Sequence, residues 1–187
     1  MTVMELELAR HDWAVFTGGV AATEHLPRAL RHLFAATDAD AVRHHAEYIR
    51  HCAADDGLLA DVSPAIAAAL VHGIWTGASP GRDEALDILT DIAHARVSDL
   101  EPDAYGIVSE ADCMAEIARG LPVYAEILEV GEGPVDACVD LIFTCGDHDP
   151  WTRDRAISYF TQALALHRLR SHHDQLRACL TELERRG

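Results

Sequence analysis

The segment GRDEALDILTDIAHA, residues 81–95, has the apolar spacing of an α-helix. Its apolar positions include Leu86, Ile88, Leu89 and Ile92, and its aspartates are Asp83, Asp87 and Asp91, at steps of four. At 3.6 residues per turn, the three carboxylates fall on one helix face and repel one another. The segment therefore predicts a helix with one apolar side and an acidic stripe.

Helical periodicity continues along most of the chain, and strand alternation is hard to find. Ser63-Pro64 and Gly133-Pro134 are typical of helix starts. The predicted helices are residues 24–36, 39–54, 63–76, 81–95, 109–130, 133–145, 151–168 and 172–185. A less regular lead-in, residues 1–23, precedes them, and the longest irregular link is predicted at residues 96–108.

The eight predicted helices group into four antiparallel pairs. In each pair an apolar helix is followed by a short turn and by a second helix with one polar side. Such pairs cannot bury their apolar faces alone, whereas stacked pairs share a continuous core. We therefore predict an all-α protein whose 187 residues form a single domain, an α-solenoid of four helical hairpins. A compact helical bundle is the alternative architecture.

Three segments carry a resemblance to a known family. They are DWAVFTGGVAATEHLPRALRHL (12–33), GLLADVSPAIAAALVHGI (57–74) and CMAEIARGLPVYAEILEVGEGPV (113–135). They resemble bacterial HEAT-repeat proteins in the Trp before a Gly-containing turn, the Pro-opened helices and the internal Gly-Leu-Pro break. The resemblance extends over about residues 12–166 and implies a HEAT-like solenoid. Some similar proteins are immunity proteins encoded beside secreted toxins.

The chain departs from this family at one loop. Many members carry His-Gln before the loop glycine, whereas this sequence has Asp55-Asp56 before Gly57. A role attached to that tripeptide therefore does not carry over.

The charge of the chain is strongly negative and unevenly distributed. The net charge is −16, and residues 53–149 contain 20 acidic residues but only three Arg, a formal charge of −17. This acidity argues against binding to nucleic acid or to an anionic membrane surface. We also expect neither a signal peptide nor a membrane span. Five cysteines without a CxxC motif favour a reduced, cytoplasmic protein.

A second pair of aspartates repeats the four-residue step of the first stripe, in the segment 133–145. If both segments are second helices of their pairs, both line the concave surface that repeat proteins use for binding. The predicted groove residues are Asp83, Asp87, Asp91, Asp136 and Asp140, and the predicted rim residues are Asp55, Asp56, Glu126 and Glu129. The alternative is that each stripe is the solvated outer face of an amphipathic helix.

An acidic groove would attract a basic protein and accelerate its association. A toxin that grips phosphate is itself basic, and an acidic protein can cover its binding surface. We therefore predict a non-catalytic protein-binding module, with an immunity or antitoxin role as the most concrete version.

The sequence contains no recognisable catalytic or metal-binding motif. His44, His45 and His51 lack a matching acid at ligand spacing, and the HExxH, GxSxG and phosphate-loop motifs are absent. We predict no catalytic residue, metal or cofactor. The alternative function is a small-molecule enzyme, or a biosynthetic accessory protein, on the same scaffold. Its aromatic candidates are Trp75, Tyr105, Tyr124 and Trp151, for which core packing is the other role.

Overall fold

The computed structural model describes residues 2–17, 22–75, 80–98 and 102–186. The described chain is all-α apart from one two-stranded hairpin. It divides into two compact units, Met1–Ile117 and Ala118–Gly187. Each unit is described by itself below, and the organisation of all 187 residues as one domain stays a prediction.

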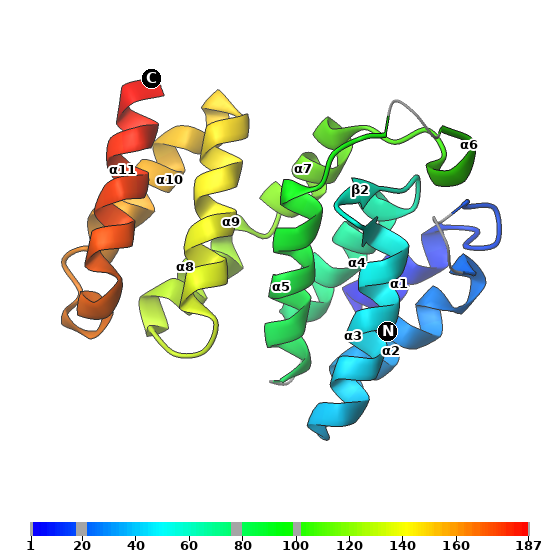
Figure 1. Ribbon diagram of the computed structural model, residues 1–187. Coiled ribbons are helices and arrows are strands. Elements are labelled where there is room, and N and C mark those ends of the chain that lie inside the picture. Colours follow the sequence, from blue (N-terminus) through cyan, green and yellow to red (C-terminus); the bar gives the residue numbers. More distant parts are fainter. Residues whose placement is uncertain (1, 18–21, 76–79, 99–101, 187) are drawn as a thin grey trace. The chain divides into compact units, whose positions relative to one another are not determined.

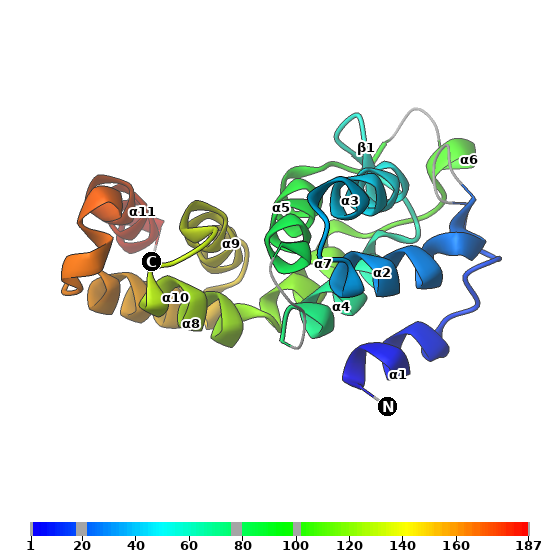
Figure 2. The same cartoon turned by 90° about the horizontal axis from the view of Figure 1, so that it is seen from below.

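The first unit contains two packed pairs of helices. Its helices are α1 (Val3–Arg10), α2 (Leu26–Ala35), α3 (Ala39–Ala53), α4 (Ser63–Ile74), α5 (Gly81–His94), α6 (Pro102–Tyr105) and α7 (Glu110–Ala118), with a 3-10 turn, η1 (Thr23–His25), before α2. Helix α2 packs against α3 and α4 packs against α5. The two pairs contact each other in two layers. One layer contains α3 and α5, and the other contains α2 and α4 (Figures 1 and 2).

Helix α4 lies at the centre of this unit. It contacts α1, α2, α3 and α5, and ten of its twelve residues are buried. A helix that is apolar nearly all round is suited to such a position. Ser63 at its start is fully buried, and its hydroxyl oxygen lies 2.6 Å from the Ala53 carbonyl oxygen and accepts from the Ala60 amide at 2.9 Å. The only hydroxyl in this helix is therefore hydrogen-bonded.

The second unit repeats the pairwise arrangement. It contains α8 (Leu121–Val130), α9 (Val135–His148), α10 (Pro150–Ala163), the 3-10 segment η2 (His167–His172) and α11 (His173–Arg186). Helix α9 packs against α8, α10 and α11, and α10 packs against α11 (Figure 2). Tyr124 and Phe160 are its largest fully buried side chains.

The predicted irregular lead-in was wrong for residues 3–10, which form α1. The Thr2 hydroxyl caps the amide of Glu5 at 3.3 Å, and Met4 and Leu8 are buried. Arg31 of α2 binds the Glu5 carboxylate through two nitrogens, at 2.9 and 2.8 Å. Such a short helix is marginal alone and depends on these tertiary contacts.

The loop after α3 contains a hairpin that strand periodicity did not predict. Strands β1 (Ala54–Asp55) and β2 (Leu58–Leu59) pair antiparallel around Asp56 and Gly57. Both turn residues have positive φ, 50° and 77°, as a type I′ turn requires. The Arg96 backbone is hydrogen-bonded to this hairpin twice. Its carbonyl oxygen accepts from the Leu59 amide, and its amide donates to the Gly57 carbonyl oxygen.

The predicted helix 109–130 is interrupted, and α7 and α8 are separated by Arg119 and Gly120. Pro122 in the first turn of α8 has no amide hydrogen and cannot continue a preceding helix. Gly120 also lies against Tyr124, since a Cβ on Gly120 would come within 2.3 Å of that ring. The helix is therefore interrupted both by the missing amide hydrogen of Pro122 and by the close packing of Gly120 against Tyr124.

The remaining differences lie at element ends. Helix α9 extends through His148, beyond the predicted end at residue 145, and α10 ends at Ala163, before the predicted end at residue 168. The link 96–108 contains the short helix α6. The existence of the other predicted helices is confirmed.

Candidate functional site

The acidic stripe on α5 lies beside a broad buried face. Its buried residues are Gly81, Ala85, Leu86, Ile88, Leu89 and Ile92. Within the first unit, α5 packs against α2, α3 and α4. Asp87 is exposed, whereas Asp83 and Asp91 are half-buried. The three aspartates thus occupy the narrow helix face that does not pack against α2, α3 or α4. Asp83 lies in the first helical turn, where negative charge is favourable.

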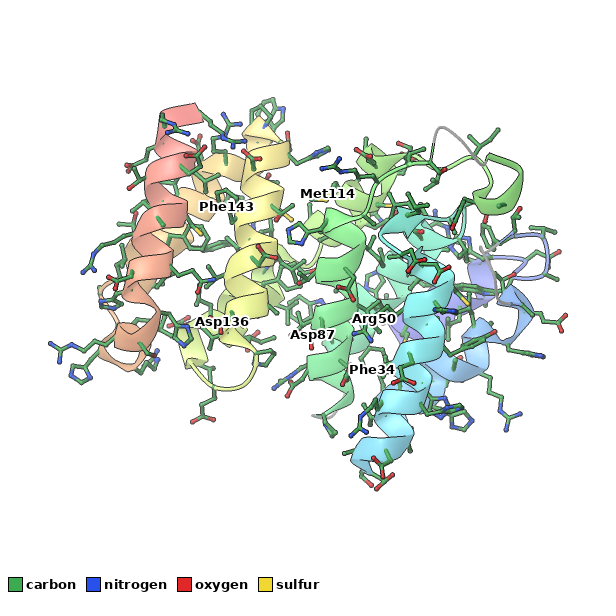
Figure 3. All side chains as sticks on the ribbon, in the orientation of Figure 1. Phe34, Arg50, Asp87, Met114, Asp136 and Phe143 are labelled. Carbon is green, nitrogen blue, oxygen red and sulfur yellow. The ribbon has the colours of Figure 1, made fainter. Side chains whose placement is uncertain are left out.

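Arg50 of α3 relieves part of the repulsion along this stripe, and Arg82 Nε lies 3.8 Å from Asp83 Oδ1. The Arg50 Nε donates to Asp91 Oδ2 at 2.6 Å, and its Nη2 lies 3.6 Å from Glu84 Oε2. Figure 3 labels Arg50 and Asp87 on the neighbouring helices α3 and α5. One guanidinium therefore joins two carboxylates of α5, and the sequence analysis did not identify either Glu84 or Arg50.

Asp87 is the carboxylate that this compensation leaves without an ion pair among the described residues. Although its side chain is exposed, the surrounding residues partly desolvate the carboxylate and raise its pKa, as do the charges of Glu84, Asp91 and Asp83, while Arg50 opposes the change. A raised pKa means that the folded chain disfavours the ionised form. The surface at Asp87 therefore has an excess of negative charge that a cation would offset.

Changing Asp87 to Asn is expected to raise the free energy of unfolding at pH 7, by about 0.2–0.5 kcal/mol. Asp and Asn have similar helix propensities, so the removed repulsion dominates. Because the folded-state pKa is raised, the penalty is present above that pKa and is lost as the pH falls. The difference between variant and wild type should therefore vanish below about pH 4.

Urea unfolding of both chains between pH 3.5 and 7 measures this difference. Asp40→Asn is the matched control, because Asp40 is exposed and lies 3.4 Å from Arg43. The control should be neutral or slightly destabilising. An Asp87 variant that is less stable than wild type at pH 7 would show that the stripe is already compensated.

The other predicted groove residues lie on α9, in the second unit. Asp136 is exposed, and its Oδ1 lies 2.9 Å from His172 Nδ1. Asp140, one turn later, is half-buried, and its charge adds to the burial that raises the pKa of Cys179. The two stripes belong to different units, so a single groove lined by both remains a prediction.

The predicted rim residues of the first unit have local structural partners. Asp55 lies in β1 with its Oδ1 3.1 Å from His51 Nδ1. Asp56 occupies the left-handed position of the hairpin turn, where Asp is better tolerated than most residues. Their recognition of a partner stays a prediction.

The predicted rim residues Glu126 and Glu129 line a pocket of about 320 Å³ between α8 and α10. The wall from α10 includes Tyr159 and Gln162, and the remaining lining is largely apolar. The Tyr159 hydroxyl accepts a hydrogen bond from Arg155 at 3.2 Å. An apolar wall with two carboxylates at its rim matches an aliphatic stem that ends in a cation.

The thiols do not form a nucleophilic centre. None of the five cysteines forms a disulfide. Burial raises the pKa of Cys52 to about 11 and the pKa values of Cys113 and Cys145 to about 12. A thiol must ionise to act as a nucleophile or a metal ligand, so these three are suited to packing.

The aromatic candidates for a small-molecule pocket occupy dissimilar positions. Tyr124 is fully buried, whereas Trp75 is 50% exposed and Trp151 is 89% exposed. Across residues 2–17, 22–75, 80–98 and 102–186, no group of three or more His, Cys, Asp or Glu side chains is placed to hold a metal ion.

Comparison with known proteins gives no assignment. No family model matches the chain, and neither the curated proteins nor the solved structures contain a match. No described helix combines the length and the apolar character needed to cross a bilayer. The functional argument therefore depends on the geometry and charge of the chain.

Proposed function

We propose that this protein is a non-catalytic, HEAT-like helical-repeat module that binds a basic protein through its acidic surfaces. The observation that carries this proposal is the carboxylate of Asp87, which forms no ion pair with a described residue. It stands among Asp83, Glu84 and Asp91, with Arg50 as the cation that bridges two of them. A Lys or Arg of a partner would lower the pKa of Asp87 and remove the repulsion.

The distribution of charge supports the same partner. Residues 53–149 carry a formal charge of −17, and α5 lies within this range. A surface of one sign steers an oppositely charged protein and raises its association rate, with a strong dependence on salt. Nucleic acid carries the wrong sign of charge for this surface.

The α8/α10 pocket offers a second anchoring position. Glu126 and Glu129 would pair with the head of an Arg or Lys, while its methylenes contact Ala125 and Leu128. Arg is the cation most enriched among residues that dominate protein interfaces.

The pairing of helices supports the solenoid form of this proposal. The pairs α2/α3, α4/α5, α8/α9 and α10/α11 each pack together, and α5 and α9 are second helices of their pairs. Helical hairpins that stack on one another give repeat proteins extended binding surfaces. In the most concrete version, the partner is a basic toxin whose active surface the module covers.

The test begins with capture of partners from extracts of the source cells and identification of a bound basic protein. The affinity of the purified pair is then measured at 50 and 200 mM salt. The Asp83→Asn, Asp87→Asn and Asp91→Asn triple variant should bind at least about tenfold more weakly than wild type. Both the wild-type affinity and this difference should fall with salt.

A triple variant of equal charge change provides the control, since Asp40, Asp154 and Asp174 are exposed and lie outside residues 53–149. Their replacement by Asn should change the affinity by less than about threefold. If both variants lose affinity equally, the effect comes from net charge alone. If the α5 variant loses no affinity, α5 is not part of the interface. The immunity version further requires that one equivalent of the chain inhibits the captured protein.

A further inference from the structure

The first unit carries a pocket lined by cationic and neutral side chains, outside the acidic range of residues 53–149. A pocket of about 490 Å³ lies between α2, with the preceding η1 turn, and α3. Its polar lining residues are His25, Arg28, His32, His44, His45 and Tyr48, and the lining includes no Asp or Glu. In a chain of net charge −16, a pocket lined by four imidazoles and a guanidinium requires a physical explanation.

The imidazoles and the guanidinium are organised by contacts across the hairpin. Arg28 Nε donates to His32 Nε2 at 3.3 Å. The His32 and His45 rings stack with centroids 5.1 Å apart and planes 17° apart. The His44 ring packs against His45 at 5.4 Å. The pocket therefore has a flat aromatic wall beside a fixed positive charge.

Among the described residues, Arg28 forms no salt bridge with a carboxylate. Burial lowers the pKa of His45, as do the neighbouring His32, His44 and Arg28. Glu24 lies 3.5 Å from His25, and Glu47 on α3 forms no ion pair with a described residue. The lining itself therefore carries one fixed positive charge, on Arg28, and no fixed negative charge.

Tyr48 lines the pocket and does not supply a negative charge to pair with Arg28. Its hydroxyl donates to the Ala22 carbonyl oxygen, so its proton is already used. Burial, with the neighbouring Cys52 and Glu24, raises the pKa of Tyr48 to about 12, which keeps the phenol neutral. Arg28 is exposed, so its guanidinium is open to an anion from solution.

We infer that this pocket binds a small organic phosphate, with Arg28, His44 and His45 holding the phosphate group. A guanidinium matches the geometry of phosphate oxygens, and protonated imidazoles add further donors. A phosphate alone does not fill about 490 Å³. The stacked rings of His32 and His45 offer a flat surface for the organic part of the ligand. This site is separate from the acidic stripe, on whose function it does not depend.

The charges fix the direction of the pH dependence. A bound dianion favours a protonated His45, so the pKa of His45 rises on binding. By linkage, the ligand binds more tightly where the His45 ring is protonated. Affinity should therefore be higher at pH 6.5 than at pH 8.0, at constant ionic strength.

Phenyl phosphate is the probe, and the full chain is titrated while the histidine ring signals are followed by NMR. The expected result is saturable shifts of the His32, His44 and His45 signals, with at least severalfold tighter binding at pH 6.5 than at pH 8.0. Phenol, which lacks the phosphate, should not bind. Glu24→Gln should strengthen binding by removing the nearby carboxylate.

Arg28→Gln should weaken binding about tenfold or more. Arg43→Gln is the matched control, because Arg43 lies on α3 outside the pocket and is paired with Asp40. It should leave the affinity within about twofold of wild type. The inference is overturned if phenyl phosphate causes no saturable shifts, or if the Arg28 and Arg43 variants lose affinity equally.

Discussion

Replacing Phe160 with Ala is expected to lower the free energy of unfolding by about 3–5 kcal/mol. Phe160 is fully buried in α10, which packs against α9 and α11. Removal of the ring loses its transfer free energy and leaves a cavity that the packed helices close only in part. Since small domains are stable by only about 5–15 kcal/mol, this loss is a large fraction of the total.

Denaturant unfolding of the full chain measures this effect, and hydrogen exchange locates it. Exchange should accelerate in α8 to α11, the helices of the second unit. Trp151→Ala is the control, because it removes a larger aromatic ring from the same helix at a position that is 89% exposed. That change should cost less than about 0.5 kcal/mol. Similar losses for Phe160 and Trp151 would contradict the described packing of α10.

Replacing Gly81 with Ala is expected to destabilise the first unit by about 2–3 kcal/mol. Elsewhere in a helix, the same change usually stabilises by up to about 1 kcal/mol. A Cβ at Gly81 would lie 2.0 Å from the Leu33 carbonyl oxygen and 2.9 Å from its carbon. These are backbone atoms of α2, so the clash is relieved only if α5 and α2 move apart.

The measurement is urea unfolding, with hydrogen exchange of the α2 and α5 amides as the local readout. Asp87→Ala is the control on the same helix, since Asp87 is exposed and has no ion pair among the described residues. It should be neutral or stabilising. A Gly81 variant that matches wild type would show that α2 and α5 are less closely packed than described.

For the acidic stripe, sequence periodicity predicts which residues share a helix face but not their partners. The steps of four place Asp83, Asp87 and Asp91 on one face whatever the rest of the fold does, and the structure has them there. Periodicity does not reveal that Arg50, 41 residues from Asp91 in sequence, pairs with this face. The partner of each carboxylate depends on how α3 lies against α5.

The cationic pocket was missed for a related reason. His25, Arg28 and His32 follow helical spacing, and His44, His45 and Tyr48 follow it again on α3. A search for metal-ligand spacing within one segment cannot detect a pocket divided between two helices. The signal was present as two cationic faces on consecutive helices, and joining them required the hairpin.

The sequence by itself determined most of the helices, because apolar spacing, Pro at helix starts and Gly in turns act within a few residues. It also determined the all-α class and the strong negative charge of residues 53–149. Only the tertiary structure decided that α1 forms, that the β1/β2 hairpin is bonded to Arg96, and which cations pair with α5. These features depend on contacts between residues far apart in the chain, whose energies no local pattern contains.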